Sequence, residues 1–140
     1  MKLRLAILAA LLCLGADHAV AAEMCTQMEA YAAEVTTDYL DSWVNVYQFF
    51  KQFRHCYDAS IAEGAADKIE LLWASRWSTL PQMIALTDKD AEFKTFIWQR
   101  IDEEIFPLDR FAVVLRNART RCPRVTVEFC RAVIQASAPR

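Results

Sequence analysis

Glycine is almost absent from this chain, and its scarcity constrains the fold more than any other feature. Only two of the 140 residues are glycines, Gly15 and Gly64. Tight β-hairpin turns need residues that accept a positive φ angle, so an all-β fold would require many more glycines. A glycine-rich loop that cradles a phosphate is excluded for the same reason.

The first 22 residues have the pattern of a bacterial secretory signal peptide. Lys2 and Arg4 form its positive start. The apolar run over residues 5–16 is too short to span a bilayer comfortably. We therefore expect residues 1–22 to be removed on export and to form no part of the fold.

Small residues near position 20 allow cleavage after Ala21 or after Ala22. The alternative is a lipoprotein anchor at Cys13, but a leucine precedes this cysteine where such sites prefer a small residue. The expected mature protein is one helical domain over residues 23–140. It is expected to be periplasmic or secreted, with no stable membrane insertion after signal cleavage.

Apolar residues recur at helical spacing through the rest of the chain. The first helical stretch is expected over about residues 37–56, and Ala32 and Val35 extend its stripe backwards. The helix can thus begin near Cys25, with a possible break at residues 36–38. One face of this stretch carries Tyr39, Trp43, Val46, Phe50 and Phe53.

A second helix is expected over about residues 58–77, with Asp58 as its N-cap. Gly64 weakens this helix by about 1 kcal/mol relative to alanine, so we expect a packing reason for it. A short helix should follow Thr79, with Pro81 in its first turn.

Three further helices complete the prediction. They are expected between the polar turn at residues 87–90 and Pro107, over residues 108–118, and over residues 127–136. Five to six helices with short links predict an all-α, compact, bundle-like domain.

Four cysteines lie in the expected mature chain: Cys25, Cys56, Cys122 and Cys130. An even number in an oxidising compartment indicates two disulfides, with buried thiols as the alternative. Cys122 and Cys130 would be about 12 Å apart on one helix, so they can pair only if residues 123–126 are not helical. We favour long-range bridges from the last helix to Cys25 and Cys56, and the sequence leaves the partners open.

No motif for catalysis or metal binding is present. The cysteines lack the close pairing of zinc sites, and His55 is the one histidine after residue 22. Asp88 and Asp90 resemble the start of a calcium loop, but the required glycine and closing glutamate are missing. Residues 102–104 are acidic and are read as a solvated face. The expectation is a protein that is not an enzyme and has no cofactor.

Charge is distributed unevenly along the chain. Residues 110–140 contain seven arginines and one acid, whereas residues 23–109 contain seven basic and sixteen acidic residues. The arginines can pair with the acidic helices within the domain, or remain solvated. Alternatively, they can bind a polar protein partner or an anionic envelope surface, because arginine suits bidentate pairing. Nucleic acid is not an expected partner in this compartment.

Two blocks of sequence carry a resemblance to known proteins. They are Ser42-Trp43 with the segment 53–64, and Arg121-Cys122-Pro123 followed by Phe129-Cys130. The chain resembles small secreted all-helical bacterial proteins. In outline it is also similar to periplasmic immunity proteins that neutralise peptidoglycan-amidase toxins of type VI secretion. The resemblance implies an exported, disulfide-linked helical protein that binds another protein.

The leading hypothesis is an exported binding protein that occludes a toxin or hydrolase. The candidate partner-binding residues lie on one helix and are expected to be exposed: Asp58, Glu63, Asp67, Glu70, Trp73 and Trp77. The alternative is that these residues form an ordinary solvated helix face with no binding role. Other hypotheses are a periplasmic chaperone or stress protein and a small-ligand carrier with an aromatic-lined pocket. A homodimer through one apolar helix face remains possible.

Overall fold

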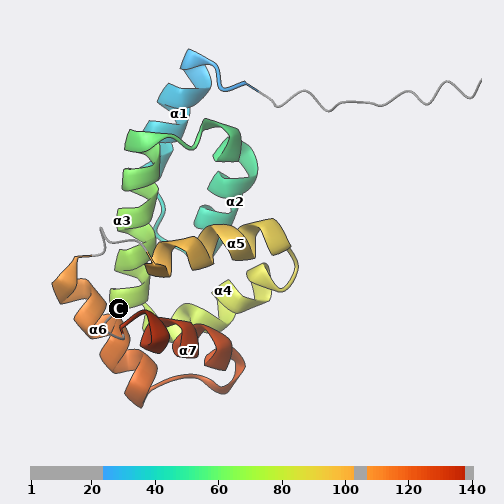
Figure 1. The fold of residues 1–140 in the computed structure, drawn as a ribbon. Helices are drawn as coiled ribbons and strands as arrows, with labels where there is room; N and C mark the ends of the chain where they lie inside the picture. The colour runs from blue at the N-terminus through green and yellow to red at the C-terminus, as the bar shows by residue number, and fades with distance from the viewer. Residues whose placement is uncertain (1–23, 103–106, 138–140) are drawn as a thin grey trace, which may run out of the picture.

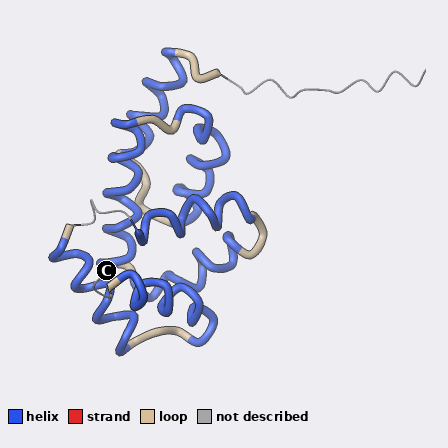
Figure 2. Tube along the Cα trace, viewed as in Figure 1, coloured by secondary structure: helices blue, strands red, loops and turns tan. Residues whose placement is uncertain are grey.

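The computed structural model describes residues 24–102 and 107–137. The predicted signal peptide and the acidic positions 103 and 104 lie outside the described residues. The described residues form seven α-helices linked by short turns of 3-10 helix, and no strand occurs among them (Figure 1, Figure 2). The all-α prediction is confirmed, with slightly more helices than the five to six expected.

The helix bounds follow the apolar periodicity closely. The elements are α1 (Gln27–Thr37), α2 (Trp43–Phe53), η1 (Arg54–Cys56), α3 (Ala59–Ser75), η2 (Trp77–Thr79), α4 (Leu80–Thr87), α5 (Ala91–Gln99), η3 (Arg100–Asp102), α6 (Leu108–Thr120), η4 (Arg124–Thr126) and α7 (Val127–Ala136).

The helix expected over residues 37–56 begins later than predicted. The chain leaves α1 at Thr37, and α2 starts at Trp43 because the Ser42 side chain accepts a hydrogen bond from the Asn45 N–H (3.3 Å). Trp43, Val46, Phe50 and Phe53 are buried as expected, together with Phe49. Tyr39 and Val35 are exposed, so their assignment to the core stripe was wrong.

Helix α3 runs through the molecule and contacts α1, α2 and α6 (Figure 1). Asp58 occupies its N-cap position, although its side chain makes no capping hydrogen bond. Gly64 faces Thr37 of α1, which confirms the expected packing reason for this glycine.

Helices α4 and α5 begin where the sequence predicts. Pro81 lies in the first turn of α4. Asp90 caps α5 by accepting a hydrogen bond from the Phe93 N–H (3.0 Å). The same carboxylate accepts hydrogen bonds from Tyr47 Oη and Lys51 Nζ, each 3.2 Å away, and so links α5 to α2.

Buried side chains from all seven helices form the hydrophobic core. Three tryptophan indole N–H groups in it have hydrogen-bond acceptors, as buried indoles usually do. Trp43 donates to Thr79 Oγ1 (2.8 Å), Trp73 to Met83 Sδ (3.3 Å) and Trp77 to the Arg121 carbonyl (2.9 Å). The aromatic residues therefore fill the core.

The disulfide pairing differs from the favoured prediction. Cys25 is bonded to Cys56, and Cys122 to Cys130, so no bridge joins the last helix to the first two cysteines. The condition that residues 123–126 be non-helical was too strict, because Arg124–Thr126 form the 3-10 helix η4. The end of α6 at Thr120 and the extended Pro123 (φ −66°, ψ 145°) are enough to allow the local pairing. This break brings the Cα atoms of Cys122 and Cys130 to 6.2 Å, within the range of a disulfide.

Candidate docking surface on the first helix

The predicted partner-binding patch on α3 is only partly exposed. Asp58, Glu63 and Asp67 are on the surface. Glu70 is buried, and its carboxylate lies 3.8 Å from the Arg110 guanidinium. Its expected exposure was therefore wrong, because the sequence did not show that α6 packs on this part of α3.

Trp73 and Trp77 are also buried, which corrects their expected exposure. The Trp73 ring packs against Phe129 of α7, with 5.2 Å between ring centroids, and Trp77 packs against the same ring at 6.3 Å. Both tryptophans therefore pack in the core against α7, Trp73 from α3 and Trp77 from η2.

A hollow of about 520 Å³ lies beside α3. Asp67 binds Arg110, which raises the pKa of Arg110, and Glu70 and Asp109 contribute to this shift. Two of the acids that line the hollow, Asp67 and Glu70, thus face Arg110. Neither this hollow nor a smaller one of about 170 Å³ has an aromatic residue in its described lining. The larger is lined by Ala59, Ala62, Glu63, Ala66, Asp67, Glu70, Arg100 and Pro107.

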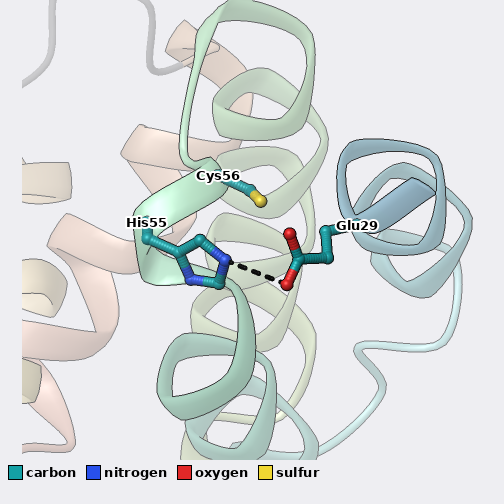
Figure 3. Close-up of side chains that lie close together, drawn as sticks. All are labelled: Glu29, His55 and Cys56. Atoms are coloured by element: carbon teal, nitrogen blue, oxygen red, sulfur yellow. Dashed lines mark ion pairs between the residues drawn. The ribbon is translucent and has the colours of Figure 1, made fainter. Parts of the chain in front are cut away.

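Glu29, His55 and Cys56 lie close together, with side chains directed toward one another from α1 and η1 (Figure 3). The group does not suit a metal, because the Cys56 sulfur is already bonded to Cys25 and cannot serve as a thiolate ligand. His55 Nε2 instead lies 3.5 Å from Glu29 Oε1, an ion-pair distance when the imidazole is protonated. The cluster is therefore a structural contact between α1 and η1.

Helix α1 carries an outward row of large apolar side chains. None of these residues was among the predicted partner-binding residues. Three of these side chains lie within α1 at spacings of three and four residues, which places them along one side of the helix, and the other two lie just before and just after it. The five residues are Met24, Met28, Tyr31, Val35 and Tyr39, which are 86%, 80%, 70%, 42% and 69% exposed. We call them the α1 stripe.

The opposite side of α1 packs on the molecule through small residues. Ala33 and Thr37 are buried, and Ala30 and Ala32 pack against the core. Small side chains let α1 lie close to α3, while the bulky ones remain outside. Both sides of the helix are thus apolar, and only one of them has a partner within the described residues.

The start of α1 is held in three ways. Thr26 and Glu29 form a capping box, in which each side chain bonds the other residue's backbone N–H (3.3 and 2.9 Å). The hydrogen bonds from Thr26 lower the pKa of Glu29, and His55 adds to this effect. The Cys25–Cys56 bridge then ties the residue before the cap to η1.

The chain segment that carries the α1 stripe is acidic. No lysine or arginine occurs from Met24 to Phe50. Glu34, Asp38 and Asp41 are exposed on the same part of the chain. Asp38 and Asp41 share the smaller hollow with Lys68 and Arg76, so cations border this end of the stripe. The apolar row beside Glu34 is suited to a partner that carries apolar and basic groups.

Sequence reasoning missed this surface, although its signal was present. The spacing of the stripe is as regular as that of the α2 stripe. Val35 and Tyr39 were instead joined to the α2 stripe as one continuous core face. Only the break between Thr37 and Trp43 separates the two stripes and lets them face in different directions.

No family model, no curated protein and no solved structure matches the chain. Within residues 24–102 and 107–137, no helix is long and apolar enough to cross a membrane.

Proposed function

We propose that this chain is an exported binding protein, an immunity protein or inhibitor that occludes a toxin or hydrolase of the cell envelope. The observation that carries the proposal is the α1 stripe. Contiguous apolar side chains that remain exposed on a folded protein commonly mark interaction sites.

The residue types in the stripe support a protein partner. Tyrosine and methionine are enriched in protein interfaces, and tyrosine combines a large apolar ring with a polar hydroxyl. Met24 and Met28 add flexible side chains that adapt to the shape of a partner. The stripe therefore offers both rigid and adaptable contacts.

The rigidity of α1 also supports binding. A helix fixed by a disulfide, by a capping box and by close packing on α3 loses little conformational freedom when a partner docks. An inhibitor benefits from such a preformed surface, because more of the contact energy remains as affinity.

Export is supported by the sequence start and by the two disulfides. Disulfides persist in oxidising compartments such as the periplasm and are rare in the bacterial cytosol. Both bridges lie in the described part of the chain and close local segments of it. The envelope is thus the compartment in which we place the partner.

Pairing of two stripes in a homodimer is disfavoured by charge. Each copy would bring Glu34, Asp38 and Asp41 to the interface, and the segment 24–50 itself carries no lysine or arginine, although Lys68 and Arg76 lie beside the two aspartates. Like charges brought together across an interface lower affinity. We therefore propose a foreign partner for this surface.

Site-specific photo-crosslinking in the exported protein tests the proposal. A photo-reactive amino acid replaces Tyr31 in one variant and Leu108, which is 87% exposed on α6, in the control. We expect a single envelope hydrolase or toxin to crosslink through position 31 and not through position 108. Purified chain should then inhibit the activity of that protein.

Two results would refute this function. Equal crosslinking from both positions would show that the stripe is not a specific surface. A broad set of unfolded proteins captured through position 31 would identify a chaperone instead.

A further inference from the structure

The end of the molecule formed by α6, η4 and α7 is rich in arginine. The exposed arginines there are Arg116, Arg119, Arg121, Arg124 and Arg131. Arg121 donates to Asn117 Oδ1 (2.6 Å). The other four make no ion pair with any residue in the described ranges.

One expectation from the sequence was that the arginines pair with acids within the domain. Arg110 does so, because it binds Asp67. The four arginines named above do not pair with any acid in the described ranges. The one acid in η4 and α7, Glu128, is held by Lys94 of α5 at 2.9 Å. This end of the molecule therefore presents positive charge that no acid in residues 24–101 and 107–137 pairs with.

Arginines and aliphatic side chains alternate along the outer side of α7. Val127, Arg131 and Ile134 follow at spacings of four and three residues, which places them along one side of α7. Arg124 precedes them in η4. All four are exposed, and Val125 beside them is also exposed. We call this row, with Val125, the α7 row.

We propose that the α7 row, with Arg116 and Arg119, is a second docking surface that rests on an anionic phospholipid membrane. Helices that lie on membrane surfaces combine basic residues, which contact phosphates, with apolar residues, which enter the headgroup region. Arginine in particular pairs with phosphate through two parallel hydrogen bonds.

The absence of aromatic residues favours a membrane over an acidic protein. Protein hot spots are commonly aromatic side chains that fill a pocket. Phe129 is the one aromatic residue in the segment 112–137, and it is buried. An anionic membrane binds a basic row through its lipid phosphates, and each arginine near the surface adds to the affinity.

The fold presents this row independently of the α1 stripe. The Cys122–Cys130 bridge fixes η4 against α7, and the other side of α7 packs into the core through Phe129 and Val133. Helices α1 and α7 lie at opposite ends of the molecule (Figure 1). The protein could therefore contact a membrane through α7 while a partner occupies α1.

Co-sedimentation with vesicles tests the inference. The full exported protein is mixed with vesicles of phosphatidylcholine alone or with added phosphatidylglycerol, at several salt concentrations. We expect binding only to the anionic vesicles, weakening as salt rises. Soluble glycerophosphate at matched ionic strength should not displace the protein, and displacement would instead identify a site for a single phosphate.

The variant Arg124→Gln/Arg131→Gln should weaken this binding about 30-fold, since each arginine near an anionic surface adds to the affinity. Arg76→Gln/Lys89→Gln is the matched control, because it removes the same charge from exposed positions outside the row. Val127→Ser/Ile134→Ser should also weaken binding to the anionic vesicles. The loss of affinity in this variant should be the same at low and at high salt, because it removes apolar contacts and no charge.

Three results would overturn the inference. These are equal binding to neutral and anionic vesicles, equal loss in the control variant, and retention on polyglutamate beads without vesicle binding. The last result would identify an acidic protein as the partner of this face. Because the assay uses no protein partner, its outcome is independent of the function proposed for the α1 stripe.

Discussion

Gly64 of α3 and Thr37 of α1 lie so close together that a Cβ atom on Gly64 would stand 2.9 Å from Thr37 Oγ1. The same Cβ atom would stand 3.2 Å from Thr37 Cβ, whereas ordinary contacts are longer. The Thr37 hydroxyl also donates to the Glu34 carbonyl (2.7 Å), which holds the side chain in place. The glycine thus sets the closeness with which α1 packs on α3.

We predict that Gly64→Ala destabilises the protein by about 1 kcal/mol. The overpacking cost of about 1–3 kcal/mol outweighs the gain of about 1 kcal/mol in helix propensity. The free energy of unfolding in urea measures the change. Combining Gly64→Ala with Thr37→Ala should cost less than the sum of the two single changes, because the smaller side chain relieves the contact. A more stable Gly64→Ala protein would contradict this packing.

The two disulfides should contribute unequally to stability. The Cys25–Cys56 bridge spans 31 residues of sequence and the Cys122–Cys130 bridge spans 8. Loop-closure entropy then predicts a loss of about 4 kcal/mol for Cys25→Ser/Cys56→Ser and about 2.5 kcal/mol for Cys122→Ser/Cys130→Ser. Denaturant titration of both variants tests the order, and the reverse order would contradict it.

Removal of the first bridge should also loosen α1 locally. Amide hydrogen exchange at Glu29 and Ala30, whose N–H groups are hydrogen-bonded to Thr26, should become faster in Cys25→Ser/Cys56→Ser than in Cys122→Ser/Cys130→Ser. Unchanged protection of these amides would show that the capping box alone fixes the start of α1.

The Asp90 carboxylate should make stability depend on acid pH. Its bond from the Phe93 N–H lowers the pKa of Asp90 below its ordinary value of 3.8, and bonds from Lys51 and Tyr47 act in the same direction. A pKa lowered by folding adds stability above the unfolded value and loses it as the pH falls through the folded value. Wild type should therefore exceed Asp90→Asn in stability near pH 6, with the gap closing below about pH 4.

Thermal unfolding of both proteins across this pH range tests the effect. Asparagine is also a good N-cap residue, so the Asp90→Asn comparison isolates the charge. A stability gap that stays constant down to about pH 2 would contradict the assigned role of the carboxylate.

Trp77→Phe should lower stability by about 2 kcal/mol, because it leaves the Arg121 carbonyl without its indole donor and opens space in the core. Trp98→Phe is the matched control, since Trp98 is only half-buried and should cost less. Chemical denaturation compares the two. Crosslinking through position 31 should be unchanged in Trp77→Phe, because its side chain is buried in the core.

Much of the fold can be predicted from the sequence because the local spacing of apolar residues indicates where the helices lie. Pro81, Asp90 and the apolar rows of α5, α6 and α7 fix element type and bounds with no information from distant residues. The packing reason for Gly64 is also predictable, since a glycine within a helix has a cost that something must offset.

Tertiary relationships were harder to predict. The exposure of Glu70 depends on Arg110, which lies far away in the sequence, and the local cysteine bridge depends on the conformation of Pro123. The same limit concealed the α1 stripe. Periodicity shows that a helix has an apolar side, but only packing shows whether that side is covered.

The most direct test of the α1 stripe as a docking surface uses the partner protein identified by crosslinking. Its affinity is measured for the wild-type protein and for Met28→Ala/Tyr31→Ala. We predict at least about a 30-fold loss of affinity by titration calorimetry, as for hot-spot residues, with unfolding free energy unchanged within about 0.5 kcal/mol. Leu108→Ala, the matched exposed change, should bind as wild type does. Affinity within about twofold of wild type for Met28→Ala/Tyr31→Ala would contradict the proposed docking surface.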